Sequence, residues 1–280
     1  MNKVKIVTDS TVDLKEEIVE KYNITIVPLT LSIDGSSYVD RVEITPQEFL
    51  EKMRVSKELP KSSQPSAGAF KEIYDELGSD GSKIISIHMT GNMSGTVRSA
   101  LTAKDLTDAD VSVVDSRFIS KALSFQVLEA AKMAQEGSSL SEILDRVSQI
   151  KNSTHLFVVV DTLENLVKGG RIGKGRAMIG SLLNIKPIAS LANGEYTPVS
   201  KARSHSQVVK YLLSEFKKDV EGKTIKAVAI VHANGMNLAQ SLKDKIVSEC
   251  EFNDVTIEET TPVISTHTGE GAIGFMYLAE

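Results

Sequence analysis

Residues 83–100, KIISIHMTGNMSGTVRSA, join an apolar run of strand length to a polar, glycine-containing turn and then to a stretch with apolar residues at helical spacing. The same succession recurs along the chain, because helical stretches separate one apolar run from the next. The other strand-length runs lie at residues 4–8, 24–33, 111–114, 156–160, 185–191 and 225–231. Alternation of this kind predicts an α/β fold.

Helix starts divide the chain further. TPQE at 45–48 combines a capping box with a proline at the first helical position, and SLSE at 139–142 repeats the box. Further helices are expected after Ser66 and at residues 14–22, 95–106, 122–135, 206–216 and 237–248. The stretch 151–154 is polar and follows a helix. We therefore expect an N-terminal α/β domain over 1–153 and a C-terminal α/β domain over 154–280, with a ligand cleft between them.

The composition of the chain restricts where the protein is expected in the cell and which kinds of partner it binds. The 280 residues are 41% hydrophobic and 25% charged, which fits a globular chain with a substantial core. Apolar runs are too short to span a membrane and the N-terminus lacks a signal peptide's apolar stretch, so we expect a cytoplasmic protein with no transmembrane segment. A net charge of −5 and the absence of Trp argue against a nucleic-acid partner. The single Cys250 and the scattered histidines predict no disulfide, no metal site and no cofactor.

Three predicted strands end in an aspartate followed by a hydroxyl residue. These are Asp9-Ser10, Asp115-Ser116 and Asp161-Thr162. One interpretation is that the side chains cap the helices that follow. The other is that they line the carboxyl ends of parallel strands, where α/β proteins bind ligands. For Asp9 and Asp115 the sequence leaves both interpretations open.

Two polar turns are candidates for binding a ligand oxygen. In the turn at 61–68, Pro65 disfavours helix just before it, so Ser62 and Ser63 present their hydroxyls from an extended backbone. In the turn at 90–96, Ser94 lies at a helix start whose free backbone N–H groups can bind an anionic oxygen. The alternatives are an ordinary loop for the first turn and an ordinary N-cap for Ser94.

Two further segments carry polar or basic groups. His267 lies among small hydroxyl residues and glycines, where it serves either to hydrogen-bond a ligand or to hold the structure. The basic stretch 168–176 lacks the spacing of a phosphate-binding P-loop, so it predicts either a solvated turn or a docking segment for a protein or an anion. Ser94 and His267 are also candidates for the nucleophile and base of a serine hydrolase. However, Asn92 stands where a nucleophile elbow needs glycine, and no orienting acid is evident.

Six short motifs resemble, in order and position, those of the DegV family of bacterial proteins. They are Thr8-Asp9-Ser10, Ser62-Ser63-Gln64-Pro65-Ser66, Met93-Ser94-Gly95-Thr96, Val114-Asp115-Ser116, Gly169-Gly170-Arg171-Ile172 and Thr266-His267-Thr268-Gly269. The resemblance covers about residues 3–279 and implies two α/β domains that enclose an acyl chain. It implies a non-catalytic fatty-acid-binding protein, since some members are the lipid-carrying subunits of a bacterial fatty acid kinase. An ATP-dependent kinase is the implied partner.

Carried over position by position, the resemblance implies that Ser62 and Ser94 hold the fatty-acid carboxylate, with Ser63 and His267 close to it. Arg171 and Arg203 match basic positions that the family uses with its kinase. The family usually has Thr at the position of Ser62, and the hydroxyl is retained here. It commonly has proline at the position of Glu270, so this chain differs in loop rigidity and in charge near His267.

The resemblance therefore implies a carrier of a long-chain, palmitate-like fatty acid, with the tail buried and the carboxylate at the cleft. Binding of the carboxylate requires no metal, because hydroxyl donors and a protonatable His compensate for the hydration that a buried carboxylate loses. The alternative is a small-ligand serine hydrolase that uses Ser94 and His267. A third possibility is a binding or regulatory module with no lipid role.

Overall fold

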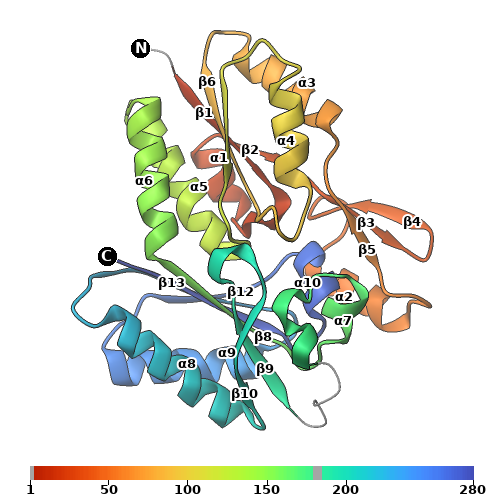
Figure 1. The fold of residues 1–280 in the computed structure, drawn as a ribbon, viewed down its shortest axis with the longest axis vertical. Coiled ribbons are helices and arrows are strands. Elements are labelled where there is room, and N and C mark those ends of the chain that lie inside the picture. Colours follow the sequence, from red (N-terminus) through yellow and green to blue (C-terminus); the bar gives the residue numbers. More distant parts are fainter. Residues whose placement is uncertain (1–2, 179–184) are drawn as a thin grey trace.

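Four parallel strands form the first sheet of the structure (Figure 1), a computed structural model that describes residues 3–178 and 185–280. The strands are β1 (Val4–Asp9), β2 (Ile24–Val27), β6 (Lys83–His88) and β7 (Val111–Asp115), in the order β2-β1-β6-β7. The helices between them are α1 (Glu16–Lys21), α2 (Pro46–Val55), α3 (Ala67–Gly78) and α4 (Thr96–Lys104). The α/β prediction is confirmed for this half of the chain.

A small antiparallel sheet projects from the first sheet (Figure 1). Its strands, in the order β4-β3-β5, are β3 (Thr30–Ile33), β4 (Ser36–Val39) and β5 (Lys61–Ser63). The single strand predicted over 24–33 is wrong, because the run contains Pro28 and divides into β2 and β3, which belong to different sheets. Proline cannot donate to a sheet ladder, so it separates the two strands.

The second large sheet is mixed, with strand order β10-β9-β8-β13-β11-β12. Its strands are β8 (Thr154–Val159), β9 (Lys186–Ser190), β10 (Thr197–Ala202), β11 (Ile225–His232), β12 (Val255–Glu259) and β13 (Ile273–Ala279). The last strand, β13, lies in the middle, antiparallel to both β8 and β11. Asp161 follows β8, whose two neighbours in the sheet, β9 and β13, both run antiparallel to it.

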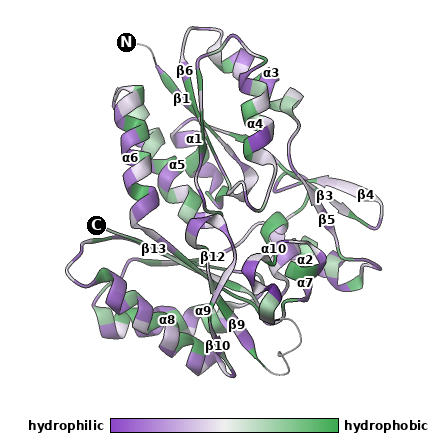
Figure 2. Ribbon diagram, viewed as in Figure 1, coloured by the Kyte–Doolittle hydropathy of each residue, from purple (hydrophilic) through white to green (hydrophobic). Residues whose placement is uncertain are grey.

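Helices form layers around the two large sheets (Figure 1). The helices α3 and α4 pack on the first sheet, and α8 (His205–Val220) and α9 (Met236–Cys250) pack on the second. Between the sheets lies α5 (Ser120–Gln135), which contacts strands of both and packs against α6 (Leu140–Ser153). In Figure 2, α6 and α8 carry hydrophilic and hydrophobic residues on different faces, as expected for helices with one buried side.

The two halves share one apolar interior. The largest buried cluster includes Ile6 and Ile85 of the first sheet together with Leu156 and Val158 of the second. The boundary predicted after residue 153 falls at the junction of α6 with β8, and the division into two domains stays a prediction. Among the described residues, no helix is long and apolar enough to cross a membrane.

Both predicted capping boxes are confirmed. The Thr45 hydroxyl accepts from the backbone N–H of Glu48, whose carboxylate accepts from the backbone N–H of Thr45. Ser139 and Glu142 exchange the same pair of hydrogen bonds. Such reciprocal bonds satisfy N–H groups that a helix leaves free, which is why a four-residue pattern suffices to locate these helix starts.

Two buried carboxyl groups join the N-terminal half to the helix α10 (Pro262–Thr268). Asp13 accepts from the Thr260 hydroxyl at 2.9 Å and from the Thr261 backbone N–H at 3.1 Å. Asp40 accepts from the Ser10 hydroxyl at 2.6 Å and from the Val263 backbone N–H at 3.3 Å. Burial raises the pKa of both carboxyls, that of Asp40 to about 7, although the hydrogen bonds act in the opposite direction.

Asp40→Asn is expected to remove a pH dependence of stability. The unfolded chain releases the Asp40 proton near pH 3.8 and the folded protein only near pH 7. Within that window the unfolded state binds fewer protons, so rising pH destabilises the fold by about 1.4 kcal/mol per pH unit for this group. The difference in free energy of unfolding between wild type and variant, measured by urea titration, should fall through the window and then level off. Parallel pH curves for the two proteins would show that Asp40 does not titrate in this way.

Candidate functional site

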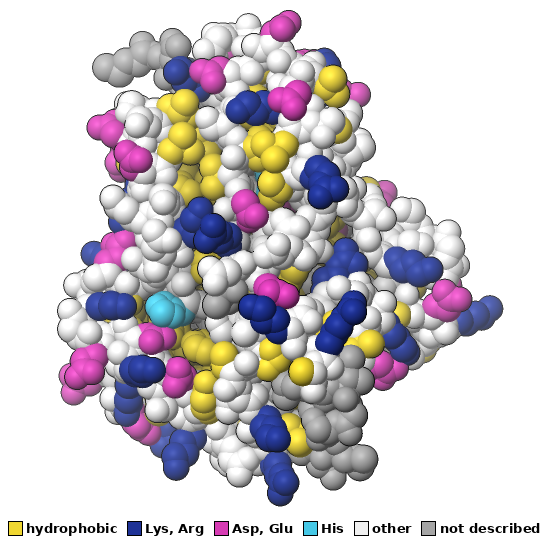
Figure 3. Space-filling view, viewed as in Figure 1, with side chains coloured by type: hydrophobic (Ala, Val, Ile, Leu, Met, Phe, Trp, Pro, Cys, Tyr) yellow, Lys and Arg dark blue, Asp and Glu magenta, His cyan; other side chains and the backbone are white. Residues whose placement is uncertain are grey.

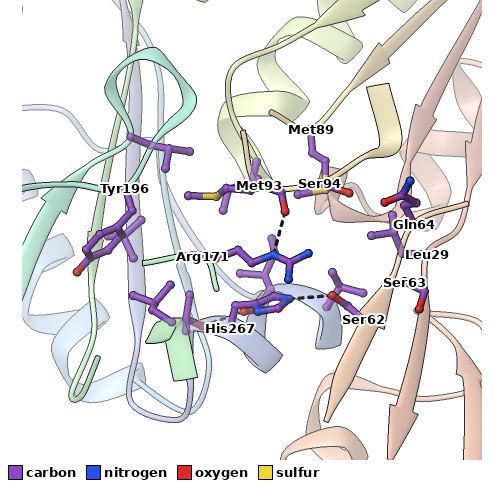
Figure 4. Close-up of a pocket in the computed structure, with 17 residues that line it drawn as sticks. Leu29, Ser62, Ser63, Gln64, Met89, Met93, Ser94, Arg171, Tyr196 and His267 are labelled. Atoms are coloured by element: carbon purple, nitrogen blue, oxygen red, sulfur yellow. Dashed lines mark hydrogen bonds between the residues drawn. The ribbon is translucent and has the colours of Figure 1, made fainter. Parts of the chain in front are cut away.

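A cavity of about 380 Å³ lies where β5, the loop before α4, the strand β8, the residue that follows β9, and α10 come together. Its apolar lining consists of Leu29, Met89, Met93, Ile119, Val158, Leu166, Leu191, Val263, Ile264 and the ring of Tyr196. Its polar lining consists of Ser62, Ser63, Gln64, Ser94, Arg171, His267 and Thr268. Figure 4 shows Ser62, Ser63, Gln64 and Ser94 toward one side of the cavity and Tyr196 on the other. The volume is in the range of small-molecule sites, and the lining is amphipathic.

Ser62 and His267 form a hydrogen-bonded pair at the polar side of the cavity. The Ser62 Oγ lies 2.8 Å from His267 Nε2, although 205 positions separate the two residues (Figure 4). Ser62 is held by pairing with Leu31 of β3, and His267 lies in the last turn of α10. This helix is not among those predicted from the sequence; it begins with Thr261 as N-cap and Pro262 in its first turn.

His267 is a neutral imidazole at ordinary pH. Burial and, as a smaller effect, the nearby positive charge of Arg171 together lower its pKa to about 4. Its Nδ1 is buried and has no hydrogen-bond partner within the described parts of the chain. Because a neutral ring carries a single N–H, His267 offers either one donor or one acceptor to Ser62, not a charge to a ligand.

Ser94 lies in the loop between β6 and α4. Its Oγ accepts from the Thr96 backbone N–H at 3.3 Å and lies 2.8 Å from the Thr96 hydroxyl. The N-cap of α4 is Gly95, so Ser94 is one residue before the position that the N-cap interpretation gives it. When the Thr96 hydroxyl donates to Ser94, the Ser94 hydrogen is free for a ligand in the cavity.

Two of the backbone N–H groups at this helix start have partners within the protein. The Gly95 N–H donates to Gln64 Oε1 at 3.1 Å, and the Thr96 N–H donates to Ser94. A side chain from the other turn therefore takes one of the positions predicted for an anion, and anion binding by the remaining N–H groups stays a prediction. The hydroxyl of Ser94, rather than the helix terminus, is the polar group available to the cavity.

Ser63 and Gln64 lie at the rim of the cavity, where both are exposed. Gln64 joins the two polar turns, since its amide accepts from Gly95 and its Nε2 donates to the Ser99 hydroxyl at 3.3 Å. Gln64 is not among the site residues predicted from the sequence. Its importance follows from the proximity of two turns about thirty residues apart.

The two basic residues lie in different settings. Arg171 lines the cavity, half-buried, and its guanidinium donates to the Met93 carbonyl at 2.9 Å and to the Gly169 carbonyl at 2.6 Å. Burial lowers the pKa of Arg171 from its ordinary value, but the group stays charged at neutral pH. Arg203 is exposed at the end of β10 and does not line the cavity. The role of both in docking a partner stays a prediction.

The two aspartates at the ends of β1 and β7 hold the loop that carries Ser94. Asp9 accepts from the Met89 backbone N–H at 2.8 Å, and Asp115 accepts from the Gly91 backbone N–H at 3.2 Å. Asp9 also caps the 3₁₀ turn that follows it, so the capping interpretation is confirmed for this residue. Neither carboxylate lines the cavity, and their hydrogen bonds instead fix the backbone near Ser94.

Glu270 is engaged by side chains from both halves of the chain. Its carboxylate accepts from Arg54 Nε at 2.8 Å and also from the Asn234 side chain. Arg54 neutralises the charge that this residue brings near His267, and the contact with α2 restrains the loop. Compared with the proline that the family commonly has at this position, Glu270 adds a negative charge and a more flexible backbone, and the contact with Arg54 reduces the effect of both.

The geometry does not assemble a serine hydrolase. His267 pairs with Ser62 rather than with Ser94, and within the described residues its Nδ1 meets no carboxylate that would orient it as a base. A pKa near 4 also makes it a weak base at neutral pH. In residues 3–178 and 185–280, no three His, Cys, Asp or Glu side chains gather closely enough to hold a metal ion.

The comparisons with known proteins cover nearly the whole chain. The profile of a family described as "Uncharacterised protein, DegV family" matches residues 3–280. A DegV domain-containing protein of Listeria monocytogenes is 43% identical over 281 residues, with 100% of both chains covered. A fatty-acid-binding DegV family protein of Thermus thermophilus has a TM-score of 0.93 at 31% identity, covering 99% of this chain and 100% of that one. DegV of Bacillus subtilis, described as a fatty acid binding protein, has a TM-score of 0.90 at 30% identity and full coverage of both chains.

Proposed function

This chain belongs to the DegV family, and on that basis we propose that it binds a long-chain fatty acid such as palmitate. The acyl tail occupies the apolar part of the cavity, and Ser62 and Ser94 donate hydrogen bonds to the carboxylate, with Ser63 and His267 beside it. The observation that carries the proposal is the division of one cavity into an apolar side and a side with several hydroxyl groups (Figure 4).

Most of the binding energy comes from the tail. Burying one methylene contributes roughly 0.8 kcal/mol, so a dozen contribute on the order of 10 kcal/mol before the costs of association. The head group has only to offset the loss of its hydration. Hydroxyl donors achieve this because charge-assisted hydrogen bonds are strong. The positive charge of Arg171 also lies near this site, since it is close enough to His267 to lower the pKa of that residue.

The carrier presents its carboxylate to an ATP-dependent kinase. In that step a carboxylate oxygen attacks the terminal phosphorus of ATP, the bond to ADP breaks, and an acyl phosphate forms. This chain holds one carboxylate oxygen and leaves the other available, so it contributes orientation rather than chemistry. Arg171 and Arg203 provide positive charge for docking the kinase. On the face shown in Figure 3, basic and acidic side chains are interspersed.

Palmitate affinity is expected to exceed that of shorter saturated acids by about fourfold for each added methylene, as burial of roughly 0.8 kcal/mol per group requires. Calorimetric titration of delipidated protein with decanoate, laurate, myristate and palmitate measures this dependence. A flat series would contradict the proposal, because it would mean that the tail stays in water.

A second experiment separates this proposal from the hydrolase alternative. A serine-reactive phosphonate probe is expected to leave Ser94 unlabelled, because no base from the described part of the chain is bonded to it. Labelling of Ser94 that depends on His267 would favour the hydrolase instead.

A further inference from the structure

The adjacent glycines of the Gly169-Gly170 motif serve different purposes. Gly170 has φ +74°, a conformation that favours glycine, and a side chain there would have open space around it. Gly169 has φ −75° and ψ −13°, which any residue adopts, so its backbone does not require glycine. A Cβ at Gly169 would instead lie 2.4 Å from His267 Nδ1, 2.9 Å from the Asn165 carbonyl oxygen and 3.0 Å from His267 Cε1. The imidazole makes the closest of these contacts, so it is the first group that a side chain at 169 would have to displace.

The backbone of Gly169 closes off one nitrogen of the ring. His267 Nδ1 is buried, lies against the Gly169 Cα and has no acceptor within the described residues. A hydrogen on Nδ1 would be a buried donor without a partner, which is costly. A hydrogen on Nε2 has an acceptor 2.8 Å away in the Ser62 Oγ.

A bound carboxylate favours the same tautomer of His267, with the hydrogen on Nε2. If Nε2 were the acceptor, the Ser62 hydroxyl would donate its only hydrogen to His267. Its oxygen would then present only lone pairs to the ligand carboxylate, which is itself an acceptor. If Nε2 is the donor, Ser62 accepts from His267 and its own hydrogen is free to point at the ligand. Only the second arrangement is attractive for an anion.

We propose that Gly169 is a positioning residue that holds His267 neutral with its hydrogen on Nε2, so that Ser62 becomes a donor to the ligand. This inference rests on the proposed function, since it takes the ligand to be a carboxylate. It assigns His267 the task of orienting a hydroxyl rather than of binding charge.

The surroundings hold both partners of this contact in place. The Gly169 carbonyl accepts from Arg171 Nη1 at 2.6 Å, and the Gly169 N–H donates to the Asn165 carbonyl at 2.8 Å. The Asn165 side chain in turn donates to the Thr266 carbonyl at 3.0 Å, next to His267. These bonds hold the backbone at Gly169 and at Thr266, so a side chain at 169 has to displace the imidazole rather than the loop.

Gly169→Ala is expected to weaken palmitate binding about tenfold, the loss expected from one misdirected hydrogen bond to a charged group. Binding of methyl palmitate, which has no carboxylate, should change less than about twofold. Gly68→Ala is the matched control, because that glycine lies in α3 with its nearest neighbour at an ordinary 3.7 Å. Equal palmitate affinity in Gly169→Ala and wild type, or equal losses for the acid and its ester, would overturn the inference.

Nitrogen-15 NMR of the wild-type palmitate complex tests the inference without relying on a variant that has to fold. The chain has five histidines, and the signal that disappears in His267→Gln identifies the residue. We expect the shifts of a neutral ring protonated at Nε2. A charged imidazolium, or a neutral ring protonated at Nδ1, would overturn the inference while leaving fatty-acid binding intact. A wild-type protein that does not bind palmitate would overturn both the inference and the proposed function.

Discussion

Replacing Ser62 and Ser94 together by alanine is expected to weaken palmitate binding about 1,000-fold, since each hydrogen bond to a charged oxygen is worth roughly 1.5–3 kcal/mol. The change also removes the acceptor of His267 Nε2, which lies 2.8 Å from Ser62 Oγ. Two donors are lost from the polar side of the cavity while the apolar lining is unchanged. The loss of palmitate affinity should therefore come only from weaker binding of the carboxylate. Calorimetric titration of the delipidated proteins measures this loss.

Two controls isolate the head group. Ser37→Ala removes an exposed hydroxyl on β4, which does not line the cavity, and should leave palmitate affinity unchanged. Methyl palmitate should bind wild type and double variant almost equally. An unchanged palmitate affinity in the double variant would mean that these hydroxyls do not hold the carboxylate.

Val158→Phe is expected to reduce palmitate affinity about 200-fold, because the ring displaces on the order of four methylenes at roughly 0.8 kcal/mol each. Val158 lies on β8 and lines the apolar side of the cavity, with 5% of its surface exposed. Phenylalanine at this position therefore fills space that the tail would occupy. Calorimetric titration with palmitate measures the loss, and octanoate, which needs less of the cavity, should lose less than about threefold.

The matched control for this variant is Val199→Phe, the same substitution on β10 of the same sheet at an exposed position outside the cavity. It should bind palmitate as wild type does. If Val158→Phe bound palmitate normally with an intact fold, the tail would have to lie elsewhere in the molecule.

Elements with local signals are predictable from this sequence. The capping boxes at Thr45 and Ser139 locate two helices because the residues that form each box are neighbours in the chain. The apolar run that becomes β6 is recognisable because a strand between helical layers is apolar on both faces. These patterns are sufficient for the α/β class.

Arrangements that depend on distant contacts are not predictable in the same way. Nothing near Ile273–Ala279 indicates that this last strand lies in the middle of the second sheet, antiparallel to two others. The pairing of Ser62 with His267 depends on how a small sheet packs against α10. The resemblance places both residues near a carboxylate, but only the fold shows that they are bonded to each other.

The apolar lining of the cavity carries no sequence signal of its own. Leu29, Leu191 and Ile264 are buried hydrophobic residues, and in the sequence they are indistinguishable from the rest of the core. Tyr196 is also fully buried, and burial raises the pKa of its hydroxyl well above the ordinary value. Only the assembled fold shows which core residues surround empty space.

Native mass spectrometry of the freshly purified protein, followed by organic extraction and identification of the released molecule, shows whether the cavity holds a fatty acid. We expect a near-stoichiometric fatty acid, whose length and unsaturation define the specificity of the cavity. A protein that carries no fatty acid, and that takes up neither palmitate nor oleate when these are added, would contradict the proposed function.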